Sequence, residues 1–244
     1  MKISFVILTW NRHQFLDLCL KNLFEKISRK NSFEVLVMDN GSTDKTSEVV
    51  KLYPEIKYTR LTKNLGLNAY KKLFNAAEGE YIVIVDDDVL DFPVDLDQIF
   101  IEYMSTFSDF GFLALDVIQN EFTDGAKPAL ANYTEVCHKD LVVQQGPTGG
   151  WCTVFRRKDY RKVKFLFQMK NLNFKKGEDG TLSRLFRKWL KLKNGIIKNK
   201  YCFHACGPYY AKKYGHLERE IEKYRASGLE DYVEKYEALL PDKE

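Results

Sequence analysis

The chain has 244 residues, of which 45% are hydrophobic and 30% are charged, and it contains 14 glycines and 6 prolines. These proportions are typical of a folded globular protein and exclude a disordered or fibrous one. The longest uninterrupted apolar run has five residues, 81–85. Because a membrane-spanning helix needs about 20 apolar residues, none is predicted. The apolar stretch near the N-terminus is too short for a signal peptide and no small-residue cleavage site follows, so we expect a cytoplasmic protein.

Charge is distributed unevenly along the chain. The net charge is +4, but residues 1–154 carry −7, residues 155–214 carry +15 and residues 215–244 carry −4. The basic segment predicts either an anionic partner, such as phosphate groups or an acidic membrane surface, or a solvated basic face. Nucleic acid is a further anionic candidate. No nucleic-acid-binding module is recognisable, however, so we expect no nucleic-acid partner.

The five cysteines are an odd number and include no C-x-x-C pair. Cys202, His204 and Cys206 lie close together in the sequence, which is typical of a metal site. A structural zinc site needs four ligands at finger-like spacing, and no second cluster supplies the rest. We therefore expect reduced cysteines that are mostly buried.

The first half of the chain alternates short β-branched runs with amphipathic helical patterns. Strands are predicted at 3–8, 34–38, 56–61 and 81–85, and helices at 15–24, 43–52 and 67–77. Ser42 or Thr43 is available to cap the second helix. Strand–helix alternation with short connections predicts right-handed parallel crossovers. We therefore expect an α/β fold with a mostly parallel sheet covered by helices on both faces.

The second half is less regular. It predicts a helix at 94–107, a strand at 112–117, a polar loop at 119–150, a strand at 151–155, a helix at 182–192 and a strand at 196–203. A charged helical tail follows over 209–240, with glycine breaks at 215 and 228. These patterns divide the chain into 1–117, 118–207 and a C-terminal helical tail, 208–244.

Three adjacent carboxylates, Asp86, Asp87 and Asp88, follow the fourth buried strand. Adjacent carboxylates repel one another unless a cation neutralises them, and oxygen ligands at this density suit Mg²⁺ or Mn²⁺ held together with substrate phosphates. Alternation along the strand places Asp86 and Asp88 on one side and Asp87 on the other. The alternative is an acidic turn before Pro93. The apolar strand that leads into the carboxylates favours the metal site.

Polar residues also follow the other predicted strands. Thr9 and Asn11 follow the first strand, and Asp39 ends the second. Ligands of open α/β sheets collect at the carboxyl ends of the strands, so these side chains and the three carboxylates should converge on one crevice. Asp39 ends a strand that should be buried, and its carboxylate is suited to accept from the N–H of a nucleobase.

The sequence resembles the family 2 glycosyltransferases of GT-A fold. The run from Ile3 to Arg12 resembles their opening strand. Further motifs follow in the family's order and spacing: DNGSTD at 39–44, Asn64-Leu65-Gly66, Gly79-Glu80-Tyr81, the D-x-D-type Asp86 to Asp88, Gly150-Trp151 and Gly177-Glu178-Asp179. The resemblance covers about residues 3–204. It implies a GT-A fold and an inverting, metal-dependent transfer of a sugar from a nucleotide-diphosphate donor to a hydroxyl acceptor.

The resemblance also implies roles for individual residues on the donor side. Thr9 and Asp39 would hold the base and ribose, and Asn11 would shape the loop beneath them. The rest of the implied nucleotide site is Asn64, Lys71, Asp86 and Asp87, and the implied ligands of Mn²⁺ or Mg²⁺ are Asp88, Asp86 and His204. Taken alone, His204 is more typical of a structural histidine. Lys71 and Lys72 stand where many members carry an Arg-Asn pair, and a lysine there lacks the bidentate geometry of arginine.

On the acceptor side, Asp179 matches the general base that deprotonates the acceptor hydroxyl, with Glu178 supporting it. Gly150 and Trp151 match the acceptor-binding loop. The nucleotide half would then span 1–117 and the acceptor half 118–207. The donor base implied by default is uracil, with thymine next, so UDP or dTDP is the expected carrier. The acceptor is a glycan, a lipid-linked glycan or a protein, in polysaccharide or glycoconjugate biosynthesis.

The basic segment at 184–193 interleaves arginine and lysine with leucine, phenylalanine and tryptophan. This pattern predicts one of two arrangements. The helix docks peripherally on an anionic membrane, at its inner face, or it packs its apolar face on the core and solvates its lysines.

Two alternatives to the transferase remain open at this point. The run 82–89 also resembles the nucleophile motif of haloacid-dehalogenase-like phosphatases, with Asp86 as nucleophile and Asp88 as acid and base. That motif normally opens its domain, whereas three strand–helix units precede it here. The second alternative is a protein that binds nucleotide sugars without turnover, and the intact set of Asp86, Asp88 and Asp179 argues against it.

Overall fold

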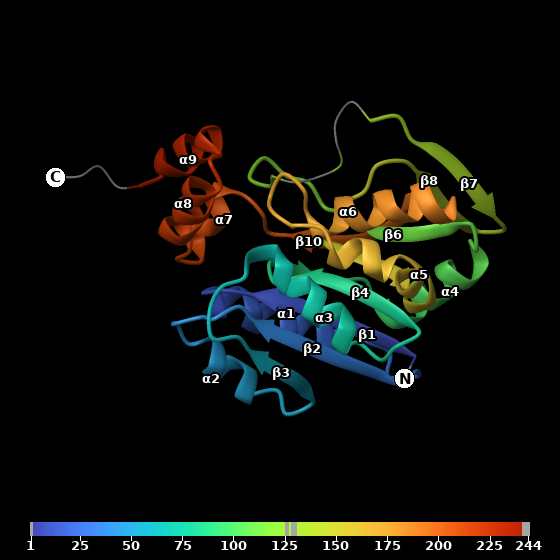
Figure 1. The fold of residues 1–244 in the computed structure, drawn as a ribbon, viewed down its shortest axis with the longest axis horizontal. Helices are drawn as coiled ribbons and strands as arrows, with labels where there is room; N and C mark the ends of the chain where they lie inside the picture. The colour runs from blue at the N-terminus through green and yellow to red at the C-terminus, as the bar shows by residue number, and fades with distance from the viewer. Residues whose placement is uncertain (1, 125–126, 128–130, 241–244) are drawn as a thin grey trace.

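The computed structural model describes residues 2–124, 127 and 131–240. Figure 1 shows helices packed around one twisted sheet, with the last three helices gathered at one end of it. The strands are β1 (Ile3–Thr9), β2 (Phe33–Asp39), β3 (Ile56–Arg60), β4 (Tyr81–Asp86), β5 (Val89–Asp91), β6 (Phe110–Val117), β7 (Thr134–His138), β8 (Leu141–Gln145), β9 (Cys152–Arg156) and β10 (Lys193–His204). The helices are α1 (His13–Lys26), α2 (Thr46–Lys51), α3 (Tyr70–Ala76), α4 (Leu96–Thr106), α5 (Arg157–Gln168), α6 (Glu178–Leu185), α7 (Pro208–Lys213), α8 (Leu217–Ala226) and α9 (Glu230–Glu237), with a 3-10 turn η1 (Gly66–Ala69) and a π-helical turn η2 (Phe186–Leu190).

The described strands form one sheet in the order β3-β2-β1-β4-β9-β6-β10-β8-β7, with β5 paired to β10 at its side. The first four strands of this order are parallel, and β9 lies antiparallel between β4 and β6. The predicted α/β class is confirmed. In the register of the parallel strands, Thr9 lies opposite Asp39, and Asp86 lies opposite Leu8. The polar residues at these strand ends therefore share one edge of the sheet.

Apolar residues fill both faces of the sheet, which explains why its central strands are apolar without alternation. Phe5 and Ile7 of β1 belong to a cluster covered by α1 and α4. Val6 belongs to a second cluster covered by α3, α5 and α6. Because successive side chains of a strand point to opposite faces, both clusters hold the strand in one register. The strand ends are thereby fixed in position relative to one another.

The second helix begins later than predicted and uses a different cap. The sequence predicted a helix from residue 43 capped by Ser42 or Thr43, but α2 begins at Thr46. The carboxylate of Asp44 accepts from the backbone N–H of Thr46 at 3.0 Å and from its hydroxyl. The Ser42 hydroxyl instead accepts from the backbone N–H of Asn11 at 2.9 Å. Two loops that reach the site are joined in this way.

Three features of the fold were not predicted: a hairpin, a short strand and a helix. The polar stretch predicted as a loop contains the hairpin β7–β8, whose first strand is exposed and lacks an apolar face. The short strand β5 pairs with the end of β10. The basic stretch after β9 forms α5, which buries Tyr160, Val163 and Phe167 on one side. The helix predicted at 182–192 begins earlier, at Glu178, and ends in the π-helical turn.

Helices α7 to α9, here called the tail, have their own small core. Leu217, Ile221, Val233 and Tyr236 are among its buried members. Figure 1 shows the tail beside the sheet edge where the parallel strands end. The side chain of Arg219 in α8 donates through Nε to the carbonyl of Trp10, directly after β1, at 3.0 Å. Within the described residues, no helix has both the length and the apolar character needed to cross a membrane.

Candidate active site

A cavity of about 450 Å³ opens at the carboxyl ends of the parallel strands. We call it the main cavity. Its walls come from the ends of β1, β2, β4 and β10, from the stretch between Asn64 and Tyr70, from Gly150, from Phe174 and the start of α6, and from helix α8. The residues that carry functional groups into it include Thr9, Arg12, Asn40, Asn64, Tyr70, Asp86, Asp87, Asp88, Glu178, Asp179, His204, Cys206, Arg219 and Lys223.

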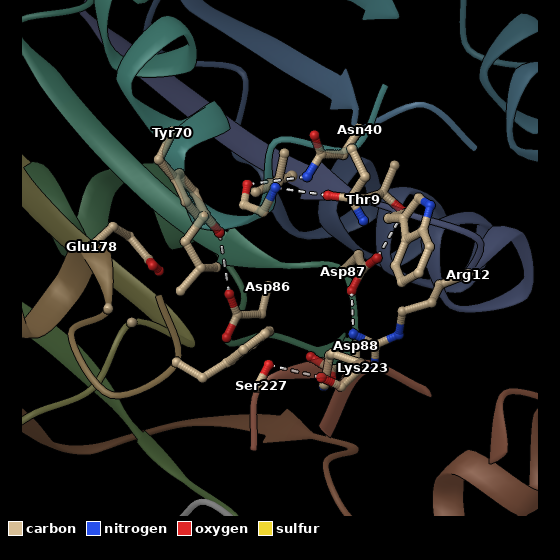
Figure 2. Close-up of a pocket in the computed structure, with 18 of the residues that line it drawn as sticks. Thr9, Arg12, Asn40, Tyr70, Asp86, Asp87, Asp88, Glu178, Lys223 and Ser227 are labelled. Carbon is tan, nitrogen blue, oxygen red and sulfur yellow. Dashed lines mark hydrogen bonds and ion pairs between the residues drawn. The ribbon is translucent and has the colours of Figure 1, made fainter. Parts of the chain in front are cut away.

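The three carboxylates after β4 have different surroundings. Asp87 accepts from the Thr9 hydroxyl at 2.7 Å and from the Arg12 guanidinium at 2.8 Å. Asp88 accepts from the other terminal nitrogen of Arg12 at 2.5 Å. Asp86 keeps a third of its side chain exposed to the cavity. One arginine therefore pairs with both buried carboxylates and offsets part of their charge, and Asp86 is left facing the open space (Figure 2).

The residues around Asp88 fit a divalent cation. Nε2 of His204 lies 3.1 Å from Oδ1 of Asp88 and 3.8 Å from Asp86. Oδ1 of Asp88 is buried and accepts no hydrogen bond within the described part of the chain. The thiol of Cys206 completes a group in which the ligand atoms of Asp88, His204 and Cys206 lie within 4.8 Å of one another. A buried carboxylate oxygen and an imidazole nitrogen aimed at the same point are suited to Mn²⁺ or Mg²⁺.

Burial and mutual repulsion set the charge of the acidic groups. Burial and the Asp88 carboxylate raise the pKa of Asp86 to about 7. Burial also opposes ionisation of Asp88, but Arg12 and His204 hold its pKa well below the usual range. Burial disfavours the charged imidazole, yet the carboxylate of Asp88 raises the pKa of His204. Without a cation, this site already distinguishes one ionised carboxylate from a neighbour that titrates near neutral pH.

The second acidic group lies at the start of α6. Glu178 is buried, and Asp179 is half-buried in the wall of the main cavity. Burial raises the pKa of both carboxyl groups, with their mutual repulsion adding to the effect on Glu178. A side chain at Gly150 would press on them, since a Cβ there would lie 3.1 Å from Cβ of Asp179. The close approach of Gly150 therefore explains why the predicted acceptor loop carries a glycine.

The donor-side residues predicted from the sequence are only partly in the cavity wall. Thr9 and Asn64 line it. Asn11 lies in the left-handed region with φ 50°, and its Oδ1 accepts from the backbone N–H of Thr43 at 2.7 Å. Asp39 is fully buried behind the wall, where it accepts from the backbone N–H of Ser42 at 2.7 Å and from the hydroxyl of Tyr58 at 2.7 Å.

Two predicted residues lie away from the main cavity. The Nζ of Lys71 donates to the carbonyl of Lys170, and the residue is absent from the cavity wall. Trp151 is 6% exposed and belongs to the core, where its indole Nε1 donates to the carbonyl of Leu115 at 2.9 Å. Its backbone carbonyl accepts from the N–H of Asp86. The structure gives Trp151 a supporting position and gives Lys71 no contact with the site.

Several cavity residues were not singled out from the sequence. Arg12 was part of the quoted opening run but received no role of its own, and Tyr70 reads as an ordinary apolar position of its helix. The Tyr70 hydroxyl lies 3.5 Å from Asp86. Arg219 and Lys223 gave no signal, because a charged helix does not reveal which of its residues face a site. Cys206 received no role from the sequence, because a structural zinc site needs four ligands and the sequence around it supplies fewer.

The basic segment at 184–193 has most of its apolar residues packed in or against the core. Leu185 and Phe186 are buried in the cluster under α6, and Leu190 and Leu192 pack against it. Trp189 is 56% exposed among the arginines and lysines. Burial thus supports core packing over a free amphipathic face. Membrane contact through this segment stays a prediction. Trp189 and the lysines and arginines around it are the residues that would make that contact.

Parts of the chain are similar to curated enzymes. Poly(ribitol-phosphate) beta-N-acetylglucosaminyltransferase TarS of Staphylococcus aureus (strain Mu50) is 32% identical over 93 residues, which are 36% of this chain and 16% of TarS. The validoxylamine A glucosyltransferase of Streptomyces hygroscopicus subsp. limoneus is 44% identical over 59 residues, 23% of this chain and 13% of that protein. The alignments span about a sixth or less of these relatives.

Solved structures share the fold over nearly the whole chain. The structure of S. aureus TarS residues 1–349 with UDP-GlcNAc matches with a TM-score of 0.63 at 19% identity, covering 100% of this chain and 68% of that one. The mannosyltransferase PcManGT of Pyrobaculum calidifontis, with GDP-Man and Mn²⁺, matches with a TM-score of 0.63 at 14% identity, covering 97% and 73%. The predicted GT-A fold is confirmed.

The family is settled by a match that extends over most of the domain. The model described as glycosyl transferase family 2 aligns with residues 4–188, well over half of the chain. Its range includes β1, the three carboxylates after β4, and the acidic pair at the start of α6. The chain therefore belongs to glycosyl transferase family 2, as its sequence motifs predicted.

Proposed function

We propose that this chain is an inverting glycosyltransferase that moves a sugar from a nucleotide-diphosphate donor, preferably a UDP-sugar, to a hydroxyl acceptor. One observation carries the proposal. Asp88 and His204, which fit a cation, and the acidic pair Glu178 and Asp179 line the same cavity. Figure 2 shows Asp88 and Glu178 on different sides of Asp86. An inverting transfer needs a base and a charge-stabilising group on opposite sides of the reacting sugar.

The acid–base role falls to Asp179. Its carboxylate takes the proton of the acceptor hydroxyl, whose oxygen forms a bond to the anomeric carbon. The bond from that carbon to the phosphate oxygen breaks, and the nucleoside diphosphate leaves with the electron pair from the opposite face. Burial raises the pKa of Asp179 and so its proton affinity, and Glu178, buried beside it, supports its position. No covalent sugar–enzyme intermediate is needed.

The donor side is assigned to the ends of β1, β2 and β4. Thr9, Asn64 and the Asp86–Asp87 pair would contact the nucleotide, while Asn11 and Asp39 hold the loops beneath it. Asp88, Asp86 and His204 would hold Mn²⁺ or Mg²⁺, which when bound offsets the charge of the diphosphate. The preference for uracil rests on relatives of the same fold, because TarS has been crystallised with UDP and with UDP-GlcNAc.

The acceptor side is assigned to residues 118–207, with Gly150 leaving room for the acceptor next to Asp179. The acceptor class is a glycan, a lipid-linked glycan or a protein. The names of relatives include different acceptors, among them poly(ribitol-phosphate) for TarS and a dolichyl N-acetyl-alpha-D-glucosaminyl phosphate for an enzyme of Methanococcus voltae. Polysaccharide or glycoconjugate synthesis is the process we propose on this basis.

A thermal unfolding scan with UDP, dTDP, GDP and CMP, each with Mn²⁺, with Mg²⁺ and with EDTA, tests the donor site. A ligand at about 100 times its dissociation constant adds about 2.7 kcal/mol to the free energy of unfolding, which such a scan resolves. We expect stabilisation by UDP only when a divalent cation is present. Stabilisation by beryllofluoride and by none of the nucleotides would instead support the phosphatase alternative, with Asp86 as the phosphorylated residue.

The substitution Asp179→Asn tests the base. Loss of the ionisable carboxyl should lower the rate of transfer by at least about 100-fold, the usual contribution of a general base, while UDP affinity stays within about threefold of the wild type. Isothermal titration with UDP and Mn²⁺, together with an assay of UDP release, separates the two quantities. A variant that loses UDP affinity would show that Asp179 belongs to the donor site, and wild-type protein without turnover would favour a binding protein.

A further inference from the structure

Helix α8 brings two cations into the main cavity from outside the part of the chain that carries the family's motifs. Arg219 and Lys223 line the cavity, with Ser227 one turn further on. The family model ends at residue 188, and the motifs noted in the sequence end at 204. The cavity wall formed by α8 is therefore a feature of this chain that neither of them assigns.

The main cavity has few positive charges to offer an anionic ligand. Among the described residues that line it, the lysines and arginines are Arg12, Arg219 and Lys223. Arg12 is committed, since its two terminal nitrogens donate to Asp87 and Asp88. Lys71, the cation predicted from the sequence for the donor, donates to Lys170 away from the cavity. The remaining cationic capacity of the cavity comes from α8.

A buried carboxylate holds these two cations in place. Glu220 is 4% exposed and forms ion pairs with both Arg219 and Lys223. Burial opposes its ionisation, but the surrounding cations lower the pKa of Glu220 to about 2, so it is charged at neutral pH. Two cations share the buried carboxylate of Glu220, so these three side chains together carry one positive charge. The carboxylate of Glu222 also lines the cavity from α8, but it is exposed to solvent.

The position of α8 is fixed by contacts with the end of β1. Besides the hydrogen bond of Arg219 to the Trp10 carbonyl, the guanidinium carbon lies 4.9 Å from the centre of the Trp10 ring. Lys223 and Asp88 both line the main cavity. In the view of Figure 2, Lys223 lies by Asp88 with Asp86 between them and Glu178, and Ser227 lies below Asp86. A group bound at Asp88 would lie within the field of Lys223, whereas an acceptor at Asp179 lies on the other side.

We propose that Arg219 and Lys223 bind the diphosphate of the donor and take up the negative charge that forms on it as it leaves. The inference rests on the proposed function and extends it to the tail. Cationic hydrogen bonds to phosphate are among the stronger ones in proteins, and charge that develops in a shielded cavity responds strongly to them. Helix α8 then supplies the positive charge for the donor that Lys71 was predicted to supply.

The test compares UDP with UMP, because UMP lacks the second phosphate. Dissociation constants for both are measured with Mn²⁺ for the wild type, for Lys223→Met, and for the control Lys212→Met. Lys212 is an exposed lysine of the neighbouring helix α7 that does not line the main cavity. We expect Lys223→Met to weaken UDP about 10- to 100-fold, the effect of losing one charged hydrogen bond, and to leave UMP within about threefold. Lys212→Met should change neither.

Folding of Lys223→Met is protected by the charges that remain, because Glu220 keeps its ion pair with Arg219 and lies 3.9 Å from Nε of Arg12. Lys223→Arg should restore most of the preference for UDP. Glu220→Gln is the second variant: it frees both cations and should leave the preference for UDP intact or increase it. An unchanged ratio of UDP to UMP affinity in Lys223→Met would overturn this inference alone. Wild-type protein that binds neither nucleotide would overturn the proposed function instead.

Discussion

His216 is a single residue whose charge state couples the tail to the rest of the molecule. It is 5% exposed, and its ring centre lies 4.8 Å from that of Phe15 in α1. Burial, with Arg12 and Arg219 nearby, lowers the pKa of His216 to about 4, although Glu220 acts in the opposite direction. The folded protein therefore holds this histidine neutral at a pH where the unfolded chain would protonate it.

The sign of the resulting pH effect follows directly. Between about pH 6.5, where an unfolded histidine titrates, and pH 4, the unfolded chain binds a proton that the folded chain refuses. The contribution of neutral His216 to the free energy of unfolding should be fully present above pH 7. It should fall by up to about 3 kcal/mol as the pH is lowered through this window. Urea unfolding of the wild type and of His216→Gln at pH 7, 5.5 and 4.5 measures it. The variant should show a smaller decline, and equal declines would contradict the assignment.

At the scale of single elements, one arginine joins three parts of the second half. Arg156 ends β9 and is 7% exposed. Its guanidinium donates to the carbonyls of Phe110 at 2.7 Å and Phe107 at 3.2 Å, and also to that of Met104. These carbonyls lie in the last turn of α4, at its C-cap and at the first residue of β6. Because the final carbonyls of a helix have no partner within it, Arg156 acts as the cap of α4.

Arg156→Met should therefore be strongly destabilising for a residue outside the cavity. It removes a cation from buried carbonyls and from Asp159, whose carboxylate lies 3.6 Å from the guanidinium. We expect a loss of about 2 to 4 kcal/mol in the free energy of unfolding. Lys158→Met, two residues along the chain and exposed, should stay within about 0.5 kcal/mol. Chemical denaturation at pH 7 compares the two, and similar losses in both would show that the cap is dispensable.

The elements that sequence patterns did not predict share a physical property. Strand β7 is exposed along most of its length, so no apolar alternation marks it. Its Val136 only packs against the core, whereas Val143 of its partner β8 is buried in it. Helix α5 was not predicted because it is strongly basic. Its buried residues Tyr160, Val163 and Phe167 are separated by lysines and arginines, so the apolar face is a minor part of the pattern. Strands β1 and β4 were predicted well because burial on both faces leaves a continuous apolar run.

At the scale of the whole molecule, the sequence predicted the side of the site that parallel strands build. The carboxyl ends of strands β1, β2 and β4 meet at one edge of the sheet. The acidic pair at the start of α6 and His204 at the end of β10 line the same cavity. What it missed depends on tertiary packing. How α3 and α8 pack against the rest of the molecule decides whether Lys71 or Lys223 faces the cavity. The sequence of neither helix predicts that packing.

The contact between Arg219 and Trp10 joins residues 209 positions apart, and this separation has a consequence for biosynthesis. The sheet and its strand-end carboxylates can fold while translation is still under way, because chains fold from the N-terminus as they emerge. The cavity lacks one wall until helix α8 has left the ribosome and docked against the end of β1. A nascent chain would thus carry Asp179 and the acidic cluster in place yet lack Arg219 and Lys223. If these two residues bind the diphosphate as we propose, donor binding would begin only after synthesis has passed α8.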